Sequence, residues 1–291
     1  MLLRALFRAA HGCCKPKTDP NPMNERALSV LIPAFNEEQT IIPVLRRVLA
    51  LGSLLKEVIV IDDGSLDRTA ERVQDFAADH ALIRFYRLSK NSGKTAAIQR
   101  ALDIATGDII IVQDADLECD PAEIPDVVAP ILAGQADVVY GSRFLVRRAA
   151  RVQYFSHYLA NTALTFFSNL LTNRNMTDIE TCYKAFRAGV IKPLRLTSRG
   201  FGMEVEITAM VTKSRARIHE VPISYQSRSY EEGKKIGISD GVMAGLYILY
   251  YNLVAPRLPK GRRYVAEVNS FLAVERYGDT PAVVATAGTA A

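Results

Sequence analysis

The sequence contains few cysteines and no long apolar run, and both absences narrow the class of protein. Its 291 residues include four cysteines, at positions 13, 14, 119 and 182. No two of them have the spacing of a CxxC motif or of a Cys/His zinc site, so we expect free thiols in a reducing compartment. No segment reaches the roughly 18 to 20 apolar residues that a membrane span needs. The longest candidate, Gly245 to Val254, has about half that length.

The sequence also lacks a strong excess of one charge. It carries 36 Lys and Arg against 31 Asp and Glu, a net charge of +5, which is well below what a nucleic-acid-binding protein usually carries. The hydrophobic share is 49% and the charged share 23%. This balance is typical of a globular protein, and it excludes a disordered chain, a collagen and a disulfide-stapled miniprotein.

Short apolar runs alternate with amphipathic stretches from residue 27 onward. Strands are predicted at residues 27–33, 57–61, 82–88, 108–112 and 137–140. Helices are predicted at residues 38–51, 67–78, 94–105 and 122–133. Because the strands are apolar throughout, both of their faces are expected to be buried. The pattern therefore predicts an α/β fold with a doubly wound, mostly parallel sheet and helices on both faces.

The pattern changes after about residue 154. A long apolar helix is predicted at 154–172, a second helix at 201–213, a strand at 217–225 and a C-terminal amphipathic helix at 240–253. We expect three parts: an N-terminal extension or linker at 1–26, a main domain at 27–254, and a basic segment with a flexible tail at 255–291.

Two segments outside the main domain leave their roles open. Met1–Ala10 places apolar and arginine side chains on opposite sides of a helix. It is either an in-plane helix on an anionic bilayer or an extension ahead of the domain, with Met23 as an alternative first residue. The basic cluster after residue 256 is either a membrane-surface contact beside the tyrosines of the last helix or a solvated face.

Polar and mostly acidic residues follow four consecutive predicted strands. The strand ends read PAFNE at 33–37, DDGS at 62–65, NSGK at 91–94 and DADLE at 114–118. In an open parallel sheet, ligands bind beyond the carboxyl ends of the strands. One acidic turn alone would be an ordinary helix cap, but four together indicate a binding crevice.

The Asp114-x-Asp116 pair, with Glu118 two residues further on, is the strongest metal-binding candidate. Carboxylate oxygens are hard ligands that suit Mg²⁺ or Mn²⁺ holding a diphosphate. The alternative is a solvated acidic turn, because a bare DxD occurs by chance in many proteins. Its position at a strand end, opposite Asp62 and Asp63, favours the metal site.

Two other nucleotide-binding motifs are excluded. Residues 92–95 (SGKT) resemble the end of a P-loop, but that motif needs a glycine at the position that Leu88 occupies. No GxGxxG follows the first strand, so a dinucleotide-binding fold is not supported.

The order and spacing of PAFNE, IDDGSLDRT, KNSGKTAAI and QDADLE resemble the nucleotide-sugar domain of the family-2 glycosyltransferases, which have the GT-A fold. The later motifs GSR at 141–143, TDIETCYKAFR at 177–187 and EVPISYQSRSYEEGKKI at 220–236 resemble the dolichyl- and polyprenyl-phosphate glycosyltransferase branch. The resemblance covers about residues 28–253.

The resemblance implies roles for individual residues. The nucleotide-binding residues would be Pro33, Phe35, Glu37, Ile61, Asp63, Asp114 and Ala115. The metal ligands would be Asp114, Asp116 and Glu118. The residues that act in catalysis, three of them on the acceptor phosphate, would be Asp116, Arg143, Arg228 and Lys234. The branch often has Gln at the position of Glu118, so the metal preference stays open. The branch commonly reads Asp-Pro-x-Ser-Gly where this sequence, from Asp178, reads Asp-Ile-Glu-Thr-Cys, so the choice of acceptor or sugar also stays open.

The resemblance implies an inverting, Mg²⁺- or Mn²⁺-dependent enzyme that moves a sugar from GDP-mannose or a UDP-hexose to a polyprenyl phosphate. A phosphate acceptor arrives as an anion and needs no general base. We expect a cytoplasmic protein that is peripheral on the cytoplasmic face of the membrane. One alternative is transfer to a saccharide or small-molecule hydroxyl, with Asp178, Glu180 or Glu204 as base. Another is a non-catalytic nucleotide-sugar-binding partner subunit.

Overall fold

The computed structural model describes residues 27–145, 151, 154–200, 202–227 and 238–278, with side chains of 238–240 left out. The strands of this part are β1 (Leu28–Ala34), β2 (Leu55–Asp62), β3 (Ile83–Arg87), β4 (Ile109–Val112), β5 (Val138–Ser142), β6 (Lys184–Arg187) and β7 (Ile218–Pro222). The helices are α1 (Ile41–Leu49), α2 (Thr69–Ala78), α3 (Lys94–Ile104), α4 (Ile124–Leu132), α5 (Phe155–Thr172), α6 (Ala188–Ile191), α7 (Gly202–Val211), α8 (Ile238–Leu249) and α9 (Pro259–Tyr277).

The strands form one sheet in the order β3-β2-β1-β4-β6-β5-β7. β1 pairs in parallel with β2 and β4, β2 with β3, and β5 with β7. β6 runs antiparallel to both of its neighbours, β4 and β5. The carboxyl ends of β1, β2, β3 and β4 therefore meet at one edge, as the mostly parallel sheet predicted from the sequence requires.

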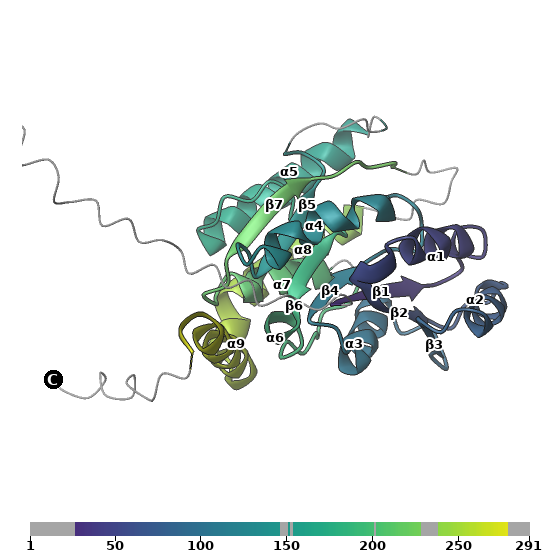
Figure 1. The fold of residues 1–291 in the computed structure, drawn as a ribbon. Coiled ribbons are helices and arrows are strands. Elements are labelled where there is room, and N and C mark those ends of the chain that lie inside the picture. The colour runs from purple at the N-terminus through teal and green to yellow at the C-terminus, as the bar shows by residue number, and fades with distance from the viewer. Residues whose placement is uncertain (1–26, 146–150, 152–153, 201, 228–237, 279–291) are drawn as a thin grey trace, which may run out of the picture.

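Helices cover both faces of the sheet (Figure 1). Successive residues of β1 show why, because Val30 packs in the core beneath α1, α2 and α4, whereas Leu31 packs in the core beneath α3, α7 and α9. A strand buried on both faces needs apolar side chains at every position. The predicted doubly wound α/β arrangement is confirmed, and the five strands expected before residue 141 all form.

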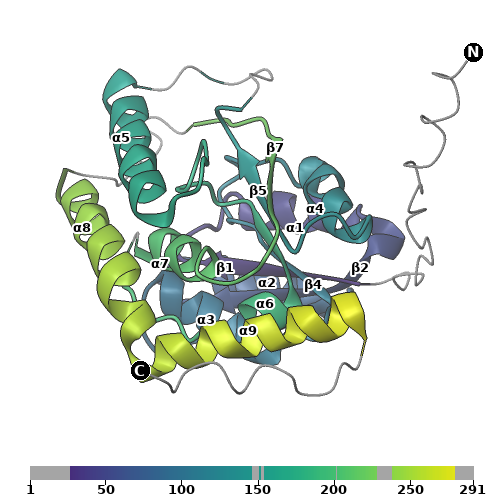
Figure 2. The ribbon, with the colours of Figure 1, turned by 90° about the vertical axis from the view of Figure 1, so that its left-hand side faces the viewer.

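The elements β6, α6 and α9 in the second half were not expected from the sequence. β6 is four residues long and includes Lys184, so it lacks the apolar run that marks the other strands. α9 lies in the segment that we expected to be a basic, flexible tail beyond residue 254. Its Tyr264, Val268 and Leu272 are buried in the core on the side of α3 and α6 (Figure 2). The prediction that the domain ends at residue 254 is therefore wrong, because this narrow stripe buries α9 against α6 and α7.

The C-terminal amphipathic helix expected at 240–253 corresponds to α8 and the π-helical turn that follows it, Tyr250–Val254. Among the residues that the structure describes, no helix is both long and apolar enough to cross a bilayer. The segments predicted as an N-terminal extension (1–26) and as the end of the tail (279–291) lie outside the described residues.

Candidate active site

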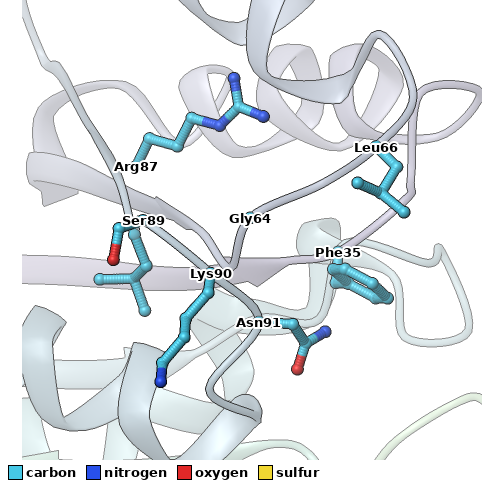
Figure 3. A pocket seen from close by; sticks show the side chains of 8 residues that line it. Phe35, Gly64, Leu66, Arg87, Ser89, Lys90 and Asn91 are labelled. Carbon is cyan, nitrogen blue, oxygen red and sulfur yellow. The ribbon is translucent and has the colours of Figure 1, made fainter.

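A cavity of about 550 Å³ opens beyond the ends of β1, β2 and β3. Phe35 lines it from the end of β1, Leu66 from the turn after β2, and Arg87 and Lys90 from the end of β3 and the loop behind it (Figure 3). A half-buried aromatic ring, an apolar side chain and two cations together suit a ligand with a flat ring and negative charge.

Gly64 lets the two loops that form this cavity approach each other. Its φ is +73°, and a Cβ there would lie 2.8 Å from the backbone carbonyl carbon of Lys90 and 2.9 Å from the backbone nitrogen of Asn91. A residue with a side chain would be strained both by this backbone conformation and by the contact. The glycine is therefore part of what shapes the cavity.

The two aspartates at the end of β2, Asp62 and Asp63, have their carboxylates occupied by the protein. Asp63 accepts hydrogen bonds from the backbone N–H of Ser92 (2.8 Å) and of Gly93 (2.7 Å), and it is 3% exposed. The neighbouring Asp62 pairs with Arg87, with 3.1 Å between Oδ2 and Nε. Asp63 thus holds the loop after β3 onto β2, and the nucleotide contact that the resemblance implied stays a prediction.

The other predicted nucleotide-binding residues, at the end of β1 and in β2, are either near the surface or buried in the core. Phe35 lines the cavity, and Pro33 and Glu37 are half-buried at the same strand end. Glu37 also accepts a hydrogen bond from the Thr40 hydroxyl at 2.7 Å. Ile61 is fully buried in the core, so its side chain is not available to a nucleotide, and a contact through its backbone stays a prediction.

The turn after β4 carries the predicted metal ligands. Asp114 is paired with Lys94, with 2.9 Å between Oδ1 and Nζ, and Asp116 accepts a hydrogen bond from the backbone N–H of Glu118 at 3.0 Å. Leu117, between Asp116 and Glu118, has a φ of +62°, a left-handed conformation that is uncommon for leucine. Ala115 is 4% exposed and packs in the core beneath the turn.

Glu118 is engaged by a tyrosine of another segment. Its Oε2 accepts a hydrogen bond from the Tyr225 hydroxyl at 2.6 Å, beyond the end of β7. Within the described part of the chain, no three side chains of the His, Cys, Asp and Glu types are gathered as a metal site. The predicted three-carboxylate set is therefore not assembled. Asp114 and Asp116 still fit a magnesium-type ion, because such ions are commonly held by one or two carboxylates together with substrate phosphates.

Lys94, the first residue of α3, lies at one of the four predicted strand ends, but the sequence analysis assigned it no role. Its Nζ lies 3.1 Å from Oε1 of Glu204 on α7 and also contacts Asp114. Burial on its own would lower the pKa of Lys94, but the carboxylates of Asp114 and Glu204 raise it well above its ordinary value. The lysine is thus a fixed cation beside the candidate metal ligands. Its place after the third strand, at the same sheet edge, was the available signal.

A buried group of ionisable side chains lies behind this turn. Glu180 Oε1 and Glu204 Oε2 are buried without a hydrogen-bond partner. Burial, reinforced by the nearby Glu204, raises the pKa of Glu180 to about 8. Burial likewise lowers the pKa of Lys184, although Glu204 and Glu180 oppose that shift. Groups shifted in this way in a crevice are candidates for holding or moving a proton.

Arg143, which was predicted to bind the acceptor phosphate, forms an ion pair with Asp178 in the structure. Its Nε and Nη2 contact the two carboxylate oxygens of Asp178 at 2.6 and 2.7 Å, and its guanidinium carbon lies 4.9 Å from the Tyr225 ring centroid. The other two basic residues predicted to contact the acceptor, Arg228 and Lys234, lie outside the described residues. Their roles, like that of Arg143 toward a phosphate, stay predictions.

Comparisons with known proteins agree with this architecture. A dodecaprenyl-phosphate galacturonate synthase of Rhizobium johnstonii is 30% identical over 223 residues, 75% of this chain and 64% of that protein. A dolichol-phosphate mannosyltransferase of Pyrococcus furiosus is 29% identical over 72% of this chain and 59% of that protein. The chain thus spans less than two thirds of the length of these curated relatives.

Solved structures show the same fold. A glucosyl-3-phosphoglycerate synthase from Mycobacterium tuberculosis, bound to Mn²⁺, UDP and glucosyl-3-phosphoglycerate, superposes with a TM-score of 0.61 at 21% identity, covering 78% of this chain and 80% of that one. A second structure of that synthase, with Mg²⁺ and UDP, gives 0.60 at 22% identity, covering 78% and 79%. These likenesses confirm the GT-A fold expected from the sequence.

The family model described as "Glycosyl transferase family 2" matches residues 29–195, more than half of the chain. That range includes the cavity-lining loops, the Asp114–Asp116 turn and the Asp178 segment. The motifs of the sequence and the geometry of the strand ends point the same way, and the chain belongs to glycosyl transferase family 2.

Proposed function

We propose that this protein transfers one sugar from a nucleotide-sugar, such as GDP-mannose or a UDP-hexose, to a polyprenyl phosphate, with inversion at the anomeric carbon. The observation that carries the proposal is the adjacency of two features at one sheet edge. These are the cavity that ends β1, β2 and β3 and the Asp114–Asp116 turn that ends β4. The names of the Rhizobium and Pyrococcus relatives support the choice of acceptor class.

The donor half of the proposal rests on the cavity. Phe35 offers a ring face for the base, and Arg87 and Lys90 supply positive charge among the lining residues. The diphosphate would extend from there toward the turn after β4. Because the parallel order β2-β1-β4 brings these strand ends side by side, one extended ligand can contact both features.

Asp114 and Asp116 would hold Mg²⁺ or Mn²⁺, the ions bound with UDP in the two solved neighbours. When bound, the ion would offset the negative charge that grows on the departing diphosphate. Lys94 already contacts Asp114 and supplies a further fixed positive charge at this place. The chain's own contribution is thus to position the leaving group between a carboxylate pair and an ammonium group.

The acceptor phosphate would enter from the side of Arg143 and the segment that carries Arg228 and Lys234. A phosphate monoester has its second pKa near about 6, so it arrives as a nucleophilic anion. Arginine suits this position because its fork of N–H groups matches phosphate oxygens. A single in-line displacement then forms a β-linked product from an α-linked donor.

A membrane surface is proposed as the place of reaction, and the exposed faces of α5 and α8 support it. Large apolar side chains are exposed on α5 (Phe155, Leu159, Phe166 and Leu170) and on α8 (Val242 and Leu246). The two helices pack beside each other (Figure 2). The eighteen residues of α5 include no Lys, Arg, Asp or Glu. A charge-free, apolar outer face suits the interface of a bilayer, and we place the protein on the cytoplasmic side.

The direct test supplies purified protein with radiolabelled GDP-mannose or UDP-glucose, Mg²⁺ or Mn²⁺, and undecaprenyl phosphate in detergent. Label should pass into the lipid extract, and mass spectrometry of that extract identifies sugar and lipid together. The Asp116→Ala variant is the matched control. Absence of lipid-linked label with every common donor, despite nucleotide binding, would count against transfer and favour a non-catalytic nucleotide-sugar-binding subunit.

A second candidate keeps the donor site and uses a hydroxyl acceptor. The buried carboxyl of Glu180 favours it, because a hydroxyl needs a general base and a pKa of about 8 is matched to that task. Sugar transfer to a soluble saccharide in the absence of lipid and detergent would support this candidate over the first.

A further inference from the structure

Two cysteines from distant parts of the sequence meet beside the candidate metal-binding turn. Cys119 follows Glu118 directly, and Cys182 precedes the first residue of β6 by two positions. Their sulfur atoms are 2.7 Å apart, although both residues are free thiols in the structure. A disulfide bond is about 2.05 Å long, so the sulfurs need to approach by only about 0.7 Å to bond.

The backbone on both sides of the pair is already fixed. The Glu118 carbonyl accepts a hydrogen bond from the backbone N–H of Gln226 at 2.8 Å, and the Gly141 backbone N–H donates to the Tyr183 carbonyl at 2.8 Å. Cys119 is 1% exposed, whereas Cys182 is half-buried. The sulfurs therefore lie together in a partly buried place, and Cys182 is the more exposed residue of the two.

We propose that Cys119 and Cys182 are a redox modification site that forms a reversible disulfide under oxidising conditions. The oxidant is a small-molecule disulfide such as oxidised glutathione. The Cys182 sulfur attacks it, forms a mixed disulfide and releases one reduced glutathione. Cys119 then attacks the Cys182 sulfur and releases the second. Two thiols are oxidised, one glutathione disulfide is reduced, and the two protons leave on the two glutathione thiols.

The bond would join the two segments that carry the site. One is the turn with Asp114, Asp116 and Glu118, and the other is the stretch with Asp178 and Glu180. Glu118 has to leave its hydrogen bond with Tyr225 before it could join the two aspartates around an ion. A covalent link at the adjacent Cys119 would hold the turn in its present arrangement. This consequence rests on the proposed function, and we expect the oxidised protein to bind nucleotide with Mn²⁺ more weakly.

The chemical test uses the full chain with Cys13→Ser and Cys14→Ser, which leaves only the two cysteines of interest. The protein is equilibrated in mixtures of reduced and oxidised glutathione, denatured in an alkylating reagent and weighed by mass spectrometry. Both thiols should disappear together, leaving a species lighter by two hydrogen atoms and a peptide in which Cys119 is cross-linked to Cys182. Independent alkylation of the two thiols over the whole series would overturn the proposal.

A single substitution separates the two chemical steps. With Cys119→Ser added, Cys182 should stop at a stable mixed disulfide with glutathione, because the second thiol is missing. With both cysteines present, that adduct should be transient. A glutathione adduct that persists in the presence of Cys119 would contradict the second step, and with it the disulfide.

Calorimetry with UDP or GDP and Mn²⁺ tests the consequence for the site. Oxidation should weaken nucleotide binding roughly fivefold or more, and it should have no effect in a Cys119→Ser/Cys182→Ser variant. Equal affinities of the reduced and oxidised forms would refute the consequence. If neither form bound a nucleotide, the proposed function would fail, whereas the mass measurement would still decide whether the disulfide forms.

Discussion

Removing the Arg143 guanidinium should destabilise the protein strongly, because it leaves a buried carboxylate without its cation. Asp178 is fully buried and the Arg143 side chain is 13% exposed, with two contacts of 2.6 and 2.7 Å between them. Breaking one partner of a buried ion pair typically costs about 3–5 kcal/mol. Asp178 retains hydrogen bonds from the Arg143 backbone N–H and from Asn161, so we expect Arg143→Met to lower the free energy of unfolding by about 3 kcal/mol.

Two matched variants separate the ion pair from the rest of the side chain. Arg143→Lys keeps the charge but loses the fork of N–H groups, and it should cost less than Arg143→Met. The double variant Arg143→Met/Asp178→Leu removes both charges and should regain much of the lost stability. Urea unfolding followed by circular dichroism gives the three values, provided that the slope with urea stays constant.

The outcome for Arg143→Met also decides between two roles of this arginine. If its stability equals that of the wild type while turnover falls, the guanidinium points at the acceptor and the pairing with Asp178 is absent. If stability falls and the double variant restores it without restoring turnover, Arg143 both holds Asp178 and contacts the acceptor. No loss of either property would refute both the pairing and the predicted phosphate contact.

Three further predictions concern other parts of the site. Asp116→Ala should abolish turnover and leave the thermal melting curve nearly unchanged; a collapsed fold would mean that the carboxylate is structural. Gly64→Ala should lower the free energy of unfolding by more than about 1–2 kcal/mol, because residue 64 has a left-handed backbone and an alanine Cβ there would press on the backbone of Lys90. Unchanged stability in urea and an unchanged KM for the donor would contradict this. The pKa of Glu180 is raised in the folded state, so the unfolded chain loses this proton first as pH rises. The protonated Glu180 contributes fully to the free energy of unfolding below about pH 4.5, and this contribution is lost as the pH rises to about 8. In that window the free energy of unfolding should fall by at most about 1.4 kcal/mol per pH unit. Glu180→Gln should therefore flatten the pH dependence of urea stability in that window, and an unchanged slope would exclude a buried carboxyl there.

The strands of the first half were predictable because their burial leaves a local signal. Val30 and Ile32 face one core and Leu31 the other, so the whole strand is apolar and stands out in the sequence. The residues after each strand follow from the same logic, since the chain order of parallel strands puts their ends at one edge. This is why Phe35, Asp114 and Asp116 could be placed just beyond strand ends at one edge of the sheet, whereas their roles toward a nucleotide and an ion stay predictions.

β6 and α9 had no comparable local signal. Lys184 in β6 is a charged residue buried at 2% exposure, and its ammonium is accommodated by the Thr181 carbonyl and the face of the Tyr140 ring. These partners are visible only after folding. In α9 the buried Tyr264, Val268 and Leu272 recur every four residues among charged neighbours, which gives a stripe too narrow to distinguish from a solvated segment.

The roles of the polar site residues depend on partners that are far apart in the sequence. Asp63 is committed to the backbone of Ser92 and Gly93, and no pattern around residue 63 could indicate that. Lys94 meets Glu204 across 110 positions of sequence, so the residue that neutralises the Asp114 side of the crevice was not recognisable from its motif. Sequence motifs thus locate the acidic strand ends, whereas the three-dimensional pairing decides which of those acids keep oxygens available for a ligand.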